Sequence, residues 1–515
     1  MIASIRRGGL LFFSSAFLLT APITAHAKAE HIVLVVWDGM RPDFVTEANA
    51  PTLWALAHAG VTFRRHHSVY PSLTNVNSTV FATGVLPNRS GLLANYEYRP
   101  ALDPLKFIRT DNPSVTTKGD QLSGGHYLEV PTIAETIRAA GGRTAIAGGK
   151  TTTLLHDRNA IGDSVVLFSG ETLPASALVP IEKLLGPFPD RSHVPGAAGD
   201  RWTTRALTEV LWQKDVPRYS VLWLSEPDRS QHASGPGSKA ALDGIKSSDE
   251  NLALLLYALD AKGVREKTDV FVVSDHGFST IESAIDLRDR LASAGFEVLA
   301  ESEASEKNGT LRVVSNGGLA LFYITGHDAV VSKRLAEWLQ QTDFAGVLFS
   351  RREIEGTFGL DRLHLDTANA PDVMMSFRWK DQRTENGNPG IIFSMKTADP
   401  VVGTHGTLSK FDLHNLLIAA GPDFSRGTTD ELPTSNLDLV PTMAHLLGLT
   451  IPGRLDGRIL SEALPNESKK LPLVKKETVE TTRTFPGGVW RQYLQLSKIG
   501  PEVYVDEGNG ELRPK

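Results

Sequence analysis

The chain has 515 residues, a formal charge of −6 and no cysteine. This length accommodates one large α/β domain with insertions, or two ordinary domains. The lack of cysteine excludes thiol chemistry, and an acidic balance without a basic patch argues against a nucleic-acid platform.

The N-terminus has the pattern of a secretory signal. Two arginines precede an apolar stretch over residues 10–21, and a small-x-small cleavage site ends at Ala27. The apolar stretch is too short to anchor the protein in a membrane, and no later stretch is long and apolar enough. We therefore expect residues 1–27 to be a signal peptide, cleaved after about Ala27, and the mature protein to be exported, either periplasmic or secreted.

From residue 31 onward, strand-like apolar runs alternate with helical patterns. This alternation predicts an α/β fold with a largely parallel sheet and helices on both of its faces. The first strand covers residues 31–36, and a helix over residues 51–60 has proline at its start and glycine at its end. Asp38 falls at the carboxyl end of the first strand. Ligands bind at that edge of open α/β sheets, so Asp38 is a candidate for chemistry.

A short helix is expected over residues 75–83, which contain neither proline nor glycine and stop at Gly84. Thr74 stands at or beside its N-cap. A hydroxyl there either caps free backbone N–H groups or attacks an electrophile whose developing anion those groups stabilise. Asn77 lies on the same side of the first helical turn. It either donates an amide hydrogen to a phosphate oxygen or satisfies the backbone, and beside a reacting Thr74 we expect the donor role.

The next segment is less regular. Residues 103–126 are polar and without periodicity, which predicts a surface loop or a lid over the sheet edge. A helix and a strand return over residues 131–149 and lead into Lys150, within the sequence GGKT. The glycine spacing does not fit a nucleotide-binding P-loop. Lys150 therefore either contacts an anionic substrate or is a solvated surface lysine.

Three later stretches supply residue types that bind metals. Predicted strands over residues 219–224 and 268–274 are each followed by an Asp and a His, and a GTHG sequence supplies another His; these residues are Asp228, His232, Asp275, His276 and His405. Carboxylate and imidazole together suit zinc. Two ions about 4 Å apart form a clamp for in-line displacement at phosphorus. Together with Asp38, these six ligands match a two-metal site better than a single-metal one.

The remainder of the chain suggests the domain organisation. Residues 281–400 predict a smaller inserted α+β subdomain that caps the site. The catalytic domain would then comprise residues 28–280 and 401–465, while residues 466–515 predict a linker and a C-terminal β-hairpin.

The order of these residues resembles the alkaline phosphatase superfamily, and within it the type I phosphodiesterase/nucleotide pyrophosphatase family. The resemblance covers about residues 32–449. Its specific fragments are T-x-x-N-x-x-x-x-x-T-G-x-x-P from Thr74, E-P-D-x-x-x-H-x-x-G-P from Glu226, S-D-H-G-F and G-T-H-G. It implies an alkaline phosphatase-like fold and an enzyme that hydrolyses phosphodiester or pyrophosphate bonds of a small soluble substrate.

The resemblance also implies roles for individual residues. Thr74 would be the nucleophile and would form a phospho-threonine intermediate. Two divalent ions, of which Zn²⁺ fits best, would be held by two groups of ligands: Asp38, Asp275, His276 and the Thr74 oxygen, and Asp228, His232 and His405. Coordination to zinc makes a hydroxyl a competent nucleophile.

The sequence departs from the family beside the nucleophile. Many nucleotide-cleaving members follow the threonine with Phe-Pro, and the Phe stacks on a base, whereas Asn75 and Val76 stand here. Asn75 is thus a candidate substrate-binding residue without a stacking ring. Nucleobase recognition would need another aromatic, such as Tyr127, Phe168 or Trp223, although Trp223 lies within an apolar strand.

Other functions stay open at this point. A phosphonate hydrolase or a phosphomonoesterase could use the same two-zinc site, and related phosphonoacetate-type hydrolases resemble this chain in using a threonine and a lysine, which Lys150 could supply. A metal-binding protein without turnover is a third alternative, but all seven site positions are intact. The motifs do not indicate an oligomeric state.

Overall fold

The computed structural model describes residues 29–189, 196–300, 303–304, 307–465 and 471–514. The predicted signal peptide, residues 1–27, lies outside this part of the chain. Within it, no helix combines the length and the apolar composition needed to cross a bilayer.

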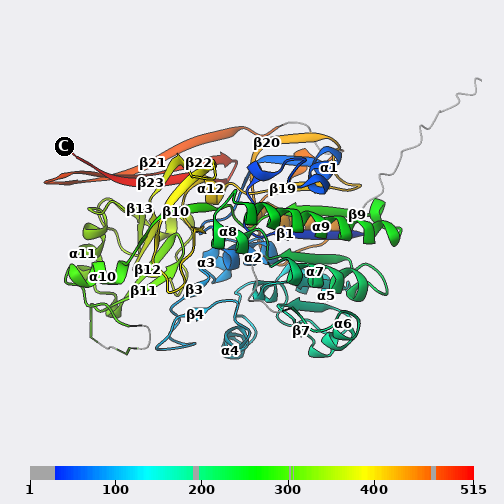
Figure 1. Ribbon diagram of the computed structural model, residues 1–515. Coiled ribbons are helices and arrows are strands. Elements are labelled where there is room, and N and C mark those ends of the chain that lie inside the picture. Colours follow the sequence, from blue (N-terminus) through cyan, green and yellow to red (C-terminus); the bar gives the residue numbers. More distant parts are fainter. Residues whose placement is uncertain (1–28, 190–195, 301–302, 305–306, 466–470, 515) are drawn as a thin grey trace, which may run out of the picture.

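A nine-stranded sheet forms the centre of the molecule (Figure 1). In spatial order its strands are β20 (Thr428–Ser435), β2 (Val61–His67), β19 (Leu417–Ala420), β9 (Thr268–Val273), β1 (His31–Trp37), β8 (Tyr219–Leu224), β5 (Thr144–Gly148), β6 (Val165–Phe168) and β7 (Glu171–Leu173). The run from β9 to β6 is parallel. Strand β19 is antiparallel to β9 and β2, and β7 is antiparallel to β6. The expected, largely parallel sheet is confirmed.

Helices cover both faces of this sheet, which explains the continuous apolar runs of its central strands. On β1, Val33 and Val35 share one core with α1, α6, α7 and α9, whereas Ile32, Leu34 and Val36 share the other with α2, α5 and α13. The bounds of these helices are α1 Pro51–Ala59, α2 Thr74–Thr83, α5 Ile133–Ala139, α6 Leu178–Leu185, α7 Ala197–Arg205, α9 Lys239–Ala261 and α13 Leu439–Leu447. Because both faces are buried, apolar side chains are favoured at every position of the strand.

Two smaller sheets lie beside the central one, on the left in Figure 1. One contains β16 (Trp379–Arg383), β17 (Pro389–Met395), β10 (Ser279–Ile285) and β18 (Gly403–Thr404). The other contains β11 (Leu311–Asn316), β12 (Leu319–Ile324), β15 (Val373–Phe377), β13 (Ala345–Ser350) and β14 (Phe358–Gly359). With α10 (Leu287–Ser293) and α11 (Ala329–Leu339), they make the insertion an α+β segment, as expected. Its exact boundaries stay a prediction.

The C-terminal part differs from the predicted linker and hairpin. It forms a three-stranded antiparallel sheet of β21 (Val474–Phe485), β22 (Gly488–Ile499) and β23 (Glu502–Pro514), along the top in Figure 1. Strand β21 was missed because its charged residues read as a solvated linker. Charged side chains are common on edge strands, since they discourage pairing with other chains.

The predicted loop over residues 103–126 also proved partly helical. It contains α4 (Pro113–Ser123), whose N-cap Asn112 accepts hydrogen bonds from two backbone N–H groups and whose first residue is proline. Gly124 ends the helix with φ = 67°. These capping signals are present in the sequence. The helix was overlooked because it lacks an apolar stripe.

Candidate active site

The predicted ligands meet at the carboxyl ends of β1, β8 and β9, which are neighbours in the sheet. Asp38 directly follows β1, and the pair Asp275 and His276 follows β9. Strand β8 leads into the short helix α8 (Asp228–Ser234), which carries His232 in its last turn. The parallel sheet therefore collects, at one edge, residues that are far apart in the sequence.

The first group of possible metal ligands comprises Asp228, His232 and His405. Asp228 Oδ1 lies 3.2 Å from His232 Nε2, because residues four apart share a helix face. The same oxygen lies 3.7 Å from His405 Nε2. Each residue offers one ligand atom, and these atoms lie within 4.8 Å of one another. This group matches one of the two sets of ligands predicted from the sequence.

The second group comprises Asp38, Asp228 and His276, whose ligand atoms also lie within 4.8 Å of one another. His276 Nε2 is 3.6 Å from Asp38 Oδ1 and 3.2 Å from Asp275 Oδ2. Asp228 therefore belongs to both groups. The sequence prediction had assigned it to one ion only.

Several buried oxygen atoms in this cluster have no donor. Among the described residues, Asp38 Oδ1, Asp228 Oδ1 and Asp275 Oδ2 have no hydrogen-bond partner. Leaving a buried acceptor unsatisfied costs about 1–3 kcal/mol, and more when the group is charged. Cations bound between these oxygens would remove that cost, so the residues fit the divalent metals that the sequence predicts.

The hydrogen bonds of the three site histidines also suit metal binding. In all three, Nδ1 lies at hydrogen-bonding distance from a backbone carbonyl, which can only accept. His232, His276 and His405 therefore carry a proton on Nδ1, which leaves Nε2, on the side of the carboxylates, as the atom that can bind a metal. The accepting oxygens belong to Gly403, Gly277 and Ser72, at 2.9, 2.9 and 2.8 Å.

Lys150 lies between two carboxylates of this cluster. Its Nζ is 2.8 Å from Asp38 Oδ2 and 2.5 Å from Asp228 Oδ2. Burial raises the pKa of Asp275 to about 7, and burial together with the Asp275 carboxylate raises the pKa of Asp38. Burial also opposes ionisation of Asp228, but Lys150 and His232 hold its pKa well below its usual range. Carboxylates crowded in this way favour the binding of cations.

Thr74 is the first residue of α2, after the N-cap Leu73, and Gly84 ends the helix with φ = 68°. The expected helix is therefore confirmed, with Thr74 one position inside it. Its Oγ1 lies 3.1 Å from His276 Nε2. The free N–H groups and the dipole at this end of the helix stabilise negative charge. The hydroxyl thus lies where a reacting anion would be stabilised.

Asn77 does not have the role expected for it. Its Nδ2 lies 3.0, 3.4 and 3.2 Å from the carbonyl oxygens of Val69, Pro71 and Leu73, and its Oδ1 accepts a hydrogen bond from the Val69 N–H at 2.8 Å. The side chain is fully buried. This contradicts the expectation that Asn77 donates to a phosphate oxygen, because its amide instead holds the loop before α2.

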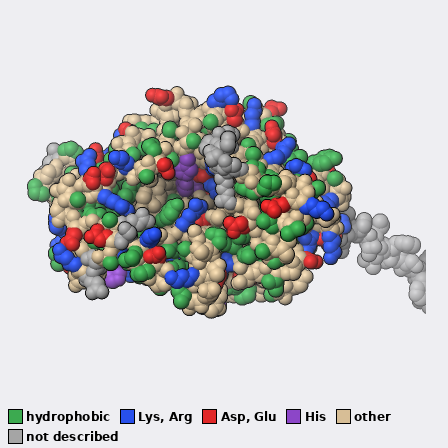
Figure 2. Space-filling model, turned by 60° about the horizontal axis from the view of Figure 1, so that its bottom comes forward, with side chains coloured by type: hydrophobic (Ala, Val, Ile, Leu, Met, Phe, Trp, Pro, Cys, Tyr) green, Lys and Arg blue, Asp and Glu red, His purple; other side chains and the backbone are tan. Residues whose placement is uncertain are grey.

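A cavity of about 340 Å³ opens over Thr74, and its lining includes Asn75, Asn95, Lys150, Asp228 and His405. Figure 2 shows histidine side chains in a hollow at the centre of one face, with charged side chains nearby. Asn75 lines the cavity, but its side-chain amide donates to Thr110 Oγ1 at 3.0 Å. Asn95 is not among the site residues predicted from the sequence, because it lies in an irregular loop where no pattern marks it.

Asn95 is oriented by its neighbour. Its Oδ1 accepts a hydrogen bond from the Asn75 N–H at 2.9 Å, so its amide nitrogen is the atom available to a ligand. It lines the cavity together with Thr74, whereas Asn77 does not. Asn95 is therefore the better candidate for a donor to phosphate.

The sequence of this chain also matches a known protein family. The profile of the type I phosphodiesterase / nucleotide pyrophosphatase family matches residues 32–407. The chain belongs to this family. The match includes every site residue that was predicted from the sequence.

Individual relatives are distant. Mouse ectonucleotide pyrophosphatase/phosphodiesterase family member 3 is 21% identical over 48% of this chain, and the match spans only 24% of the relative. Venom phosphodiesterase 2 of Crotalus adamanteus is 22% identical, with 27% of its length covered. Human family member 5 is 20% identical over 85% of this chain and 79% of its own length. The chain thus spans about a quarter of the larger relatives.

A solved structure shows the fold. Murine ectonucleotide pyrophosphatase/phosphodiesterase 5, in an inactive threonine-to-alanine variant in complex with AMP, superposes with a TM-score of 0.56 and 18% identity. The match covers 82% of this chain and 96% of the murine one. The expected alkaline phosphatase-like fold is confirmed.

Stacking of a nucleobase would need an aromatic side chain at the cavity. Tyr127, Phe168 and Trp223, named as possible stacking residues, are all buried, and none lines the cavity. Trp223 instead donates from Nε1 to Asp38 Oδ2 at 2.8 Å. Trp223 is therefore a partner of a metal-ligand candidate, not a surface for stacking.

Tyr96 does line the cavity, as the one Phe, Tyr or Trp side chain among the described residues to do so, and it is 42% exposed. It begins β3 (Tyr96–Glu97), which pairs with Arg109 of β4 (Ile108–Arg109). Asn316 of the inserted segment accepts from the Tyr96 N–H at 2.8 Å and donates to its carbonyl at 3.0 Å. Among the described residues, none between 281 and 400 lines the cavity. The described part of the insertion therefore supports the backbone of Tyr96 without lining the cavity.

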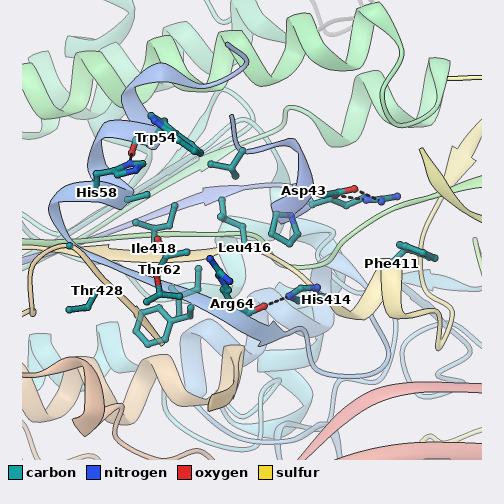
Figure 3. Close-up of a pocket in the computed structure, with 18 of the residues that line it drawn as sticks. Asp43, Trp54, His58, Thr62, Arg64, Phe411, His414, Leu416, Ile418 and Thr428 are labelled. Atoms are coloured by element: carbon teal, nitrogen blue, oxygen red, sulfur yellow. Dashed lines mark hydrogen bonds and ion pairs between the residues drawn. The ribbon is translucent and has the colours of Figure 1, made fainter. Parts of the chain in front are cut away.

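A larger cavity, of about 580 Å³, lies elsewhere, between α1, β2, β19 and α12 (Lys410–Leu413). Figure 3 shows Trp54 and His58 on one side of it and Phe411 and His414 on another. None of the metal-ligand candidates lines it. Reactive polar groups, and not cavity size, locate the chemistry, so the smaller cavity is the candidate active site.

Proposed function

We propose that this protein is a metal-dependent hydrolase that cleaves phosphodiester or pyrophosphate bonds of a small soluble substrate through a phospho-threonine intermediate. One observation supports this most strongly. Thr74 Oγ1 lies 3.1 Å from His276 Nε2, beside buried carboxylate oxygens without donors and at the positive end of α2. A hydroxyl, a cation site and a helix N-terminus together suit nucleophilic attack on phosphorus.

Two Zn²⁺ ions suit the carboxylate and imidazole ligands best. One would be held by Asp38, Asp275, His276 and Thr74, and the other by Asp228, His232 and His405. When bound, such ions lower the pKa of a coordinated hydroxyl and neutralise charge on phosphoryl oxygens. Asp228 lies within reach of both positions, so its carboxylate would hold their spacing.

The residues then suggest a two-step displacement. Thr74 Oγ1 releases its proton to water and bonds to phosphorus, while the bond from phosphorus to the leaving oxygen breaks. The leaving oxygen takes up a proton from water, so this step neither gains nor loses a proton overall. Asn95 and the free N–H groups of the first turn of α2 donate to the non-bridging oxygens. A water molecule then attacks phosphorus, the bond from phosphorus to Thr74 Oγ1 breaks, one proton of the water goes to Thr74 Oγ1 and restores the hydroxyl, and the remaining OH stays on the released phosphate product.

The reaction type is tested by comparing rates on an aryl phosphodiester, an aryl phosphomonoester and phosphonoacetate. We expect the phosphodiester to react faster than the others by orders of magnitude. A phosphonate hydrolase remains the second candidate because Lys150 lines the cavity, although Asp38 and Asp228 hold its ammonium group. Faster reaction of phosphonoacetate would favour that alternative, and faster reaction of the monoester would favour a phosphatase.

Tyr96 should determine whether nucleotides are preferred. Stacking of a base on an aromatic side chain is worth about 1–3 kcal/mol, or roughly tenfold to a hundredfold in rate. We therefore expect Tyr96→Ala to lower kcat/KM by that factor for an aryl ester of a nucleoside monophosphate. The same aryl ester without the base should be nearly unaffected.

Tyr257→Ala is a matched control, because Tyr257 is 71% exposed on α9 and does not line the cavity. Equal losses on both substrates, or a wild-type enzyme that does not prefer the nucleotide, would contradict stacking on Tyr96. If the wild-type enzyme does not prefer the nucleotide, the base has no aromatic side chain to stack on, because Asn75 stands where many nucleotide-cleaving relatives have phenylalanine.

We also propose that the protein is exported to the periplasm or secreted, on the basis of its N-terminal sequence pattern. The domain boundaries predicted at residues 280, 400 and 465 are part of the same proposal. A small-molecule phosphoester is the expected partner, and a net charge of −6 without a basic patch argues against a nucleic-acid platform.

A further inference from the structure

Next to the candidate active site, but outside its cavity, four polar side chains form a hydrogen-bond network. They are His66, Asn77, Asn415 and Asn436, and each is fully buried. None of them lines the cavity over Thr74. They come from β2, from α2, from the segment before β19 and from the short helix η8 (Asn436–Asp438).

Asn436 is at the centre of this network. Its Nδ2 donates to Asn77 Oδ1 at 2.9 Å and to the Asp275 carbonyl at 3.0 Å. Its Oδ1 lies 2.8 Å from His66 Nε2 and 3.2 Å from Asn415 Nδ2. The orientation of the amide is determined, because the Asp275 carbonyl can only accept a hydrogen bond. All four hydrogen-bonding positions of this amide are used.

The two acceptors of Asn436 belong to the two halves of the site. Asn77 binds the carbonyl oxygens of the loop that leads into Thr74. The Asp275 carbonyl belongs to the turn that carries Asp275 and His276, and Asn415 donates to Ser274 in the same turn. One amide therefore connects the segment that carries the nucleophile with the turn that carries two metal-ligand candidates.

We propose that Asn436 is a positioning residue that sets the place of Thr74 relative to Asp275 and His276. This inference rests on the function proposed above. Catalysis by a bound nucleophile is sensitive to geometry, and a displacement of about 1 Å can cost about a hundredfold in rate. Without the two donor hydrogens of Asn436, Asn77 Oδ1 and the Asp275 carbonyl each lose a partner, and the two segments can move apart.

A purely structural role predicts something different. A buried amide that only stabilises the fold would change the melting temperature, and would leave the turnover of the folded enzyme and its metal affinity unchanged. A positioning residue changes kcat more than KM. It also weakens zinc binding, because contacts behind metal ligands typically alter affinity or activity by about tenfold to a hundredfold.

The test uses Asn436→Leu, which keeps the volume of the side chain and removes its hydrogen bonds. We expect kcat for the aryl phosphodiester at saturating zinc to fall about tenfold to a hundredfold, with KM changed less than about threefold. Zinc affinity, measured by competition with a fluorescent chelator, should fall about tenfold. Values of kcat and zinc affinity within twofold of wild type would overturn the proposal.

Gln492→Leu is the matched control. Gln492 is a fully buried amide that accepts from the Leu348 N–H at 2.9 Å and donates to the Leu348 carbonyl at 3.0 Å, in another part of the molecule. It should lower the melting temperature and leave kcat and zinc affinity unchanged. If it lowers kcat and zinc affinity as much as Asn436→Leu does, the effect is a general one of core amides and the proposal fails.

A second variant covers the case in which Asn436→Leu does not fold. Asn436→Asp keeps the size and the acceptor for His66 but replaces the donor that faces Asn77 and Asp275, so it should show the same losses in kcat and zinc affinity. If wild-type protein hydrolyses none of the three test substrates, the proposed function fails. In that case, the zinc affinity of the two Asn436 variants is the measurement that tests the positioning role, independently of activity.

Discussion

Thr74→Ala should abolish turnover while the protein stays folded and keeps its metal. The expected loss in kcat is more than about 10⁴-fold, on the scale of nucleophile removal in other hydrolases. The fold should persist because Thr74 is the first residue of α2 and makes no side-chain cap, and Leu73 occupies the N-cap. The measurements are kcat on the aryl phosphodiester, circular dichroism and zinc content.

Two further variants make this experiment specific. Thr74→Ser should keep a measurable fraction of activity, because the hydroxyl survives. Thr79→Ala is the matched control: Thr79 lies in the same helix, and its hydroxyl donates to the Asn75 carbonyl at 2.8 Å instead of lining the cavity. An alanine variant of Thr74 that works at nearly the wild-type rate would disprove the assignment of the nucleophile.

Removal of metal should inactivate the enzyme just as completely. A chelator would leave Asp38, Asp228 and Asp275 crowded together with oxygens that have no donor, and Thr74 without a group to activate it. Added Zn²⁺ should restore the rate. Because a ligand that binds only the folded state stabilises it, zinc should also raise the melting temperature. Elemental analysis that finds no transition metal in active protein would contradict this prediction.

Asp228→Asn is the variant that tests the proposed metal centre most directly. Asp228 belongs to both groups of possible ligands, so the loss of its charge should weaken both ions and lower kcat by more than about 10³-fold. Asp249→Asn serves as the control, since Asp249 is a buried carboxylate that accepts from the N–H groups of Thr52 and Leu53, away from the cavity. It should affect stability and leave zinc content unchanged. Full zinc content in Asp228→Asn would rule out a shared ligand.

The sequence located the main features of the site because they depend on local patterns. The apolar runs before Asp38, Asp228 and Asp275 are strands β1, β8 and β9, and the chain order of a parallel sheet places their ends at one edge. Gly84 ends α2 where the pattern predicted. Residue type alone then indicated zinc, since carboxylate and imidazole are its usual ligands.

The role of a side chain cannot be predicted from local sequence where its hydrogen-bond partner comes from a remote segment. Asn77 has the right type and spacing for a phosphate donor, yet its amide is used by the loop before it and by Asn436, 359 positions later. Asn95 and Tyr96 reach the cavity only because α3 (Pro87–Ser90) and the β3–β4 pair return the chain to it. No periodicity marks such residues.

By itself, then, the sequence determined the α/β class, the nucleophile candidate and the metal-ligand candidates, because periodicity and residue chemistry are local properties of the chain. Only the tertiary structure decided that Lys150 lies between Asp38 and Asp228, that Asp228 belongs to both groups of possible metal ligands and that Tyr96 lines the cavity. The reason is physical. Hydrogen bonds and ion pairs join whichever groups packing brings together, and packing is set by the whole chain.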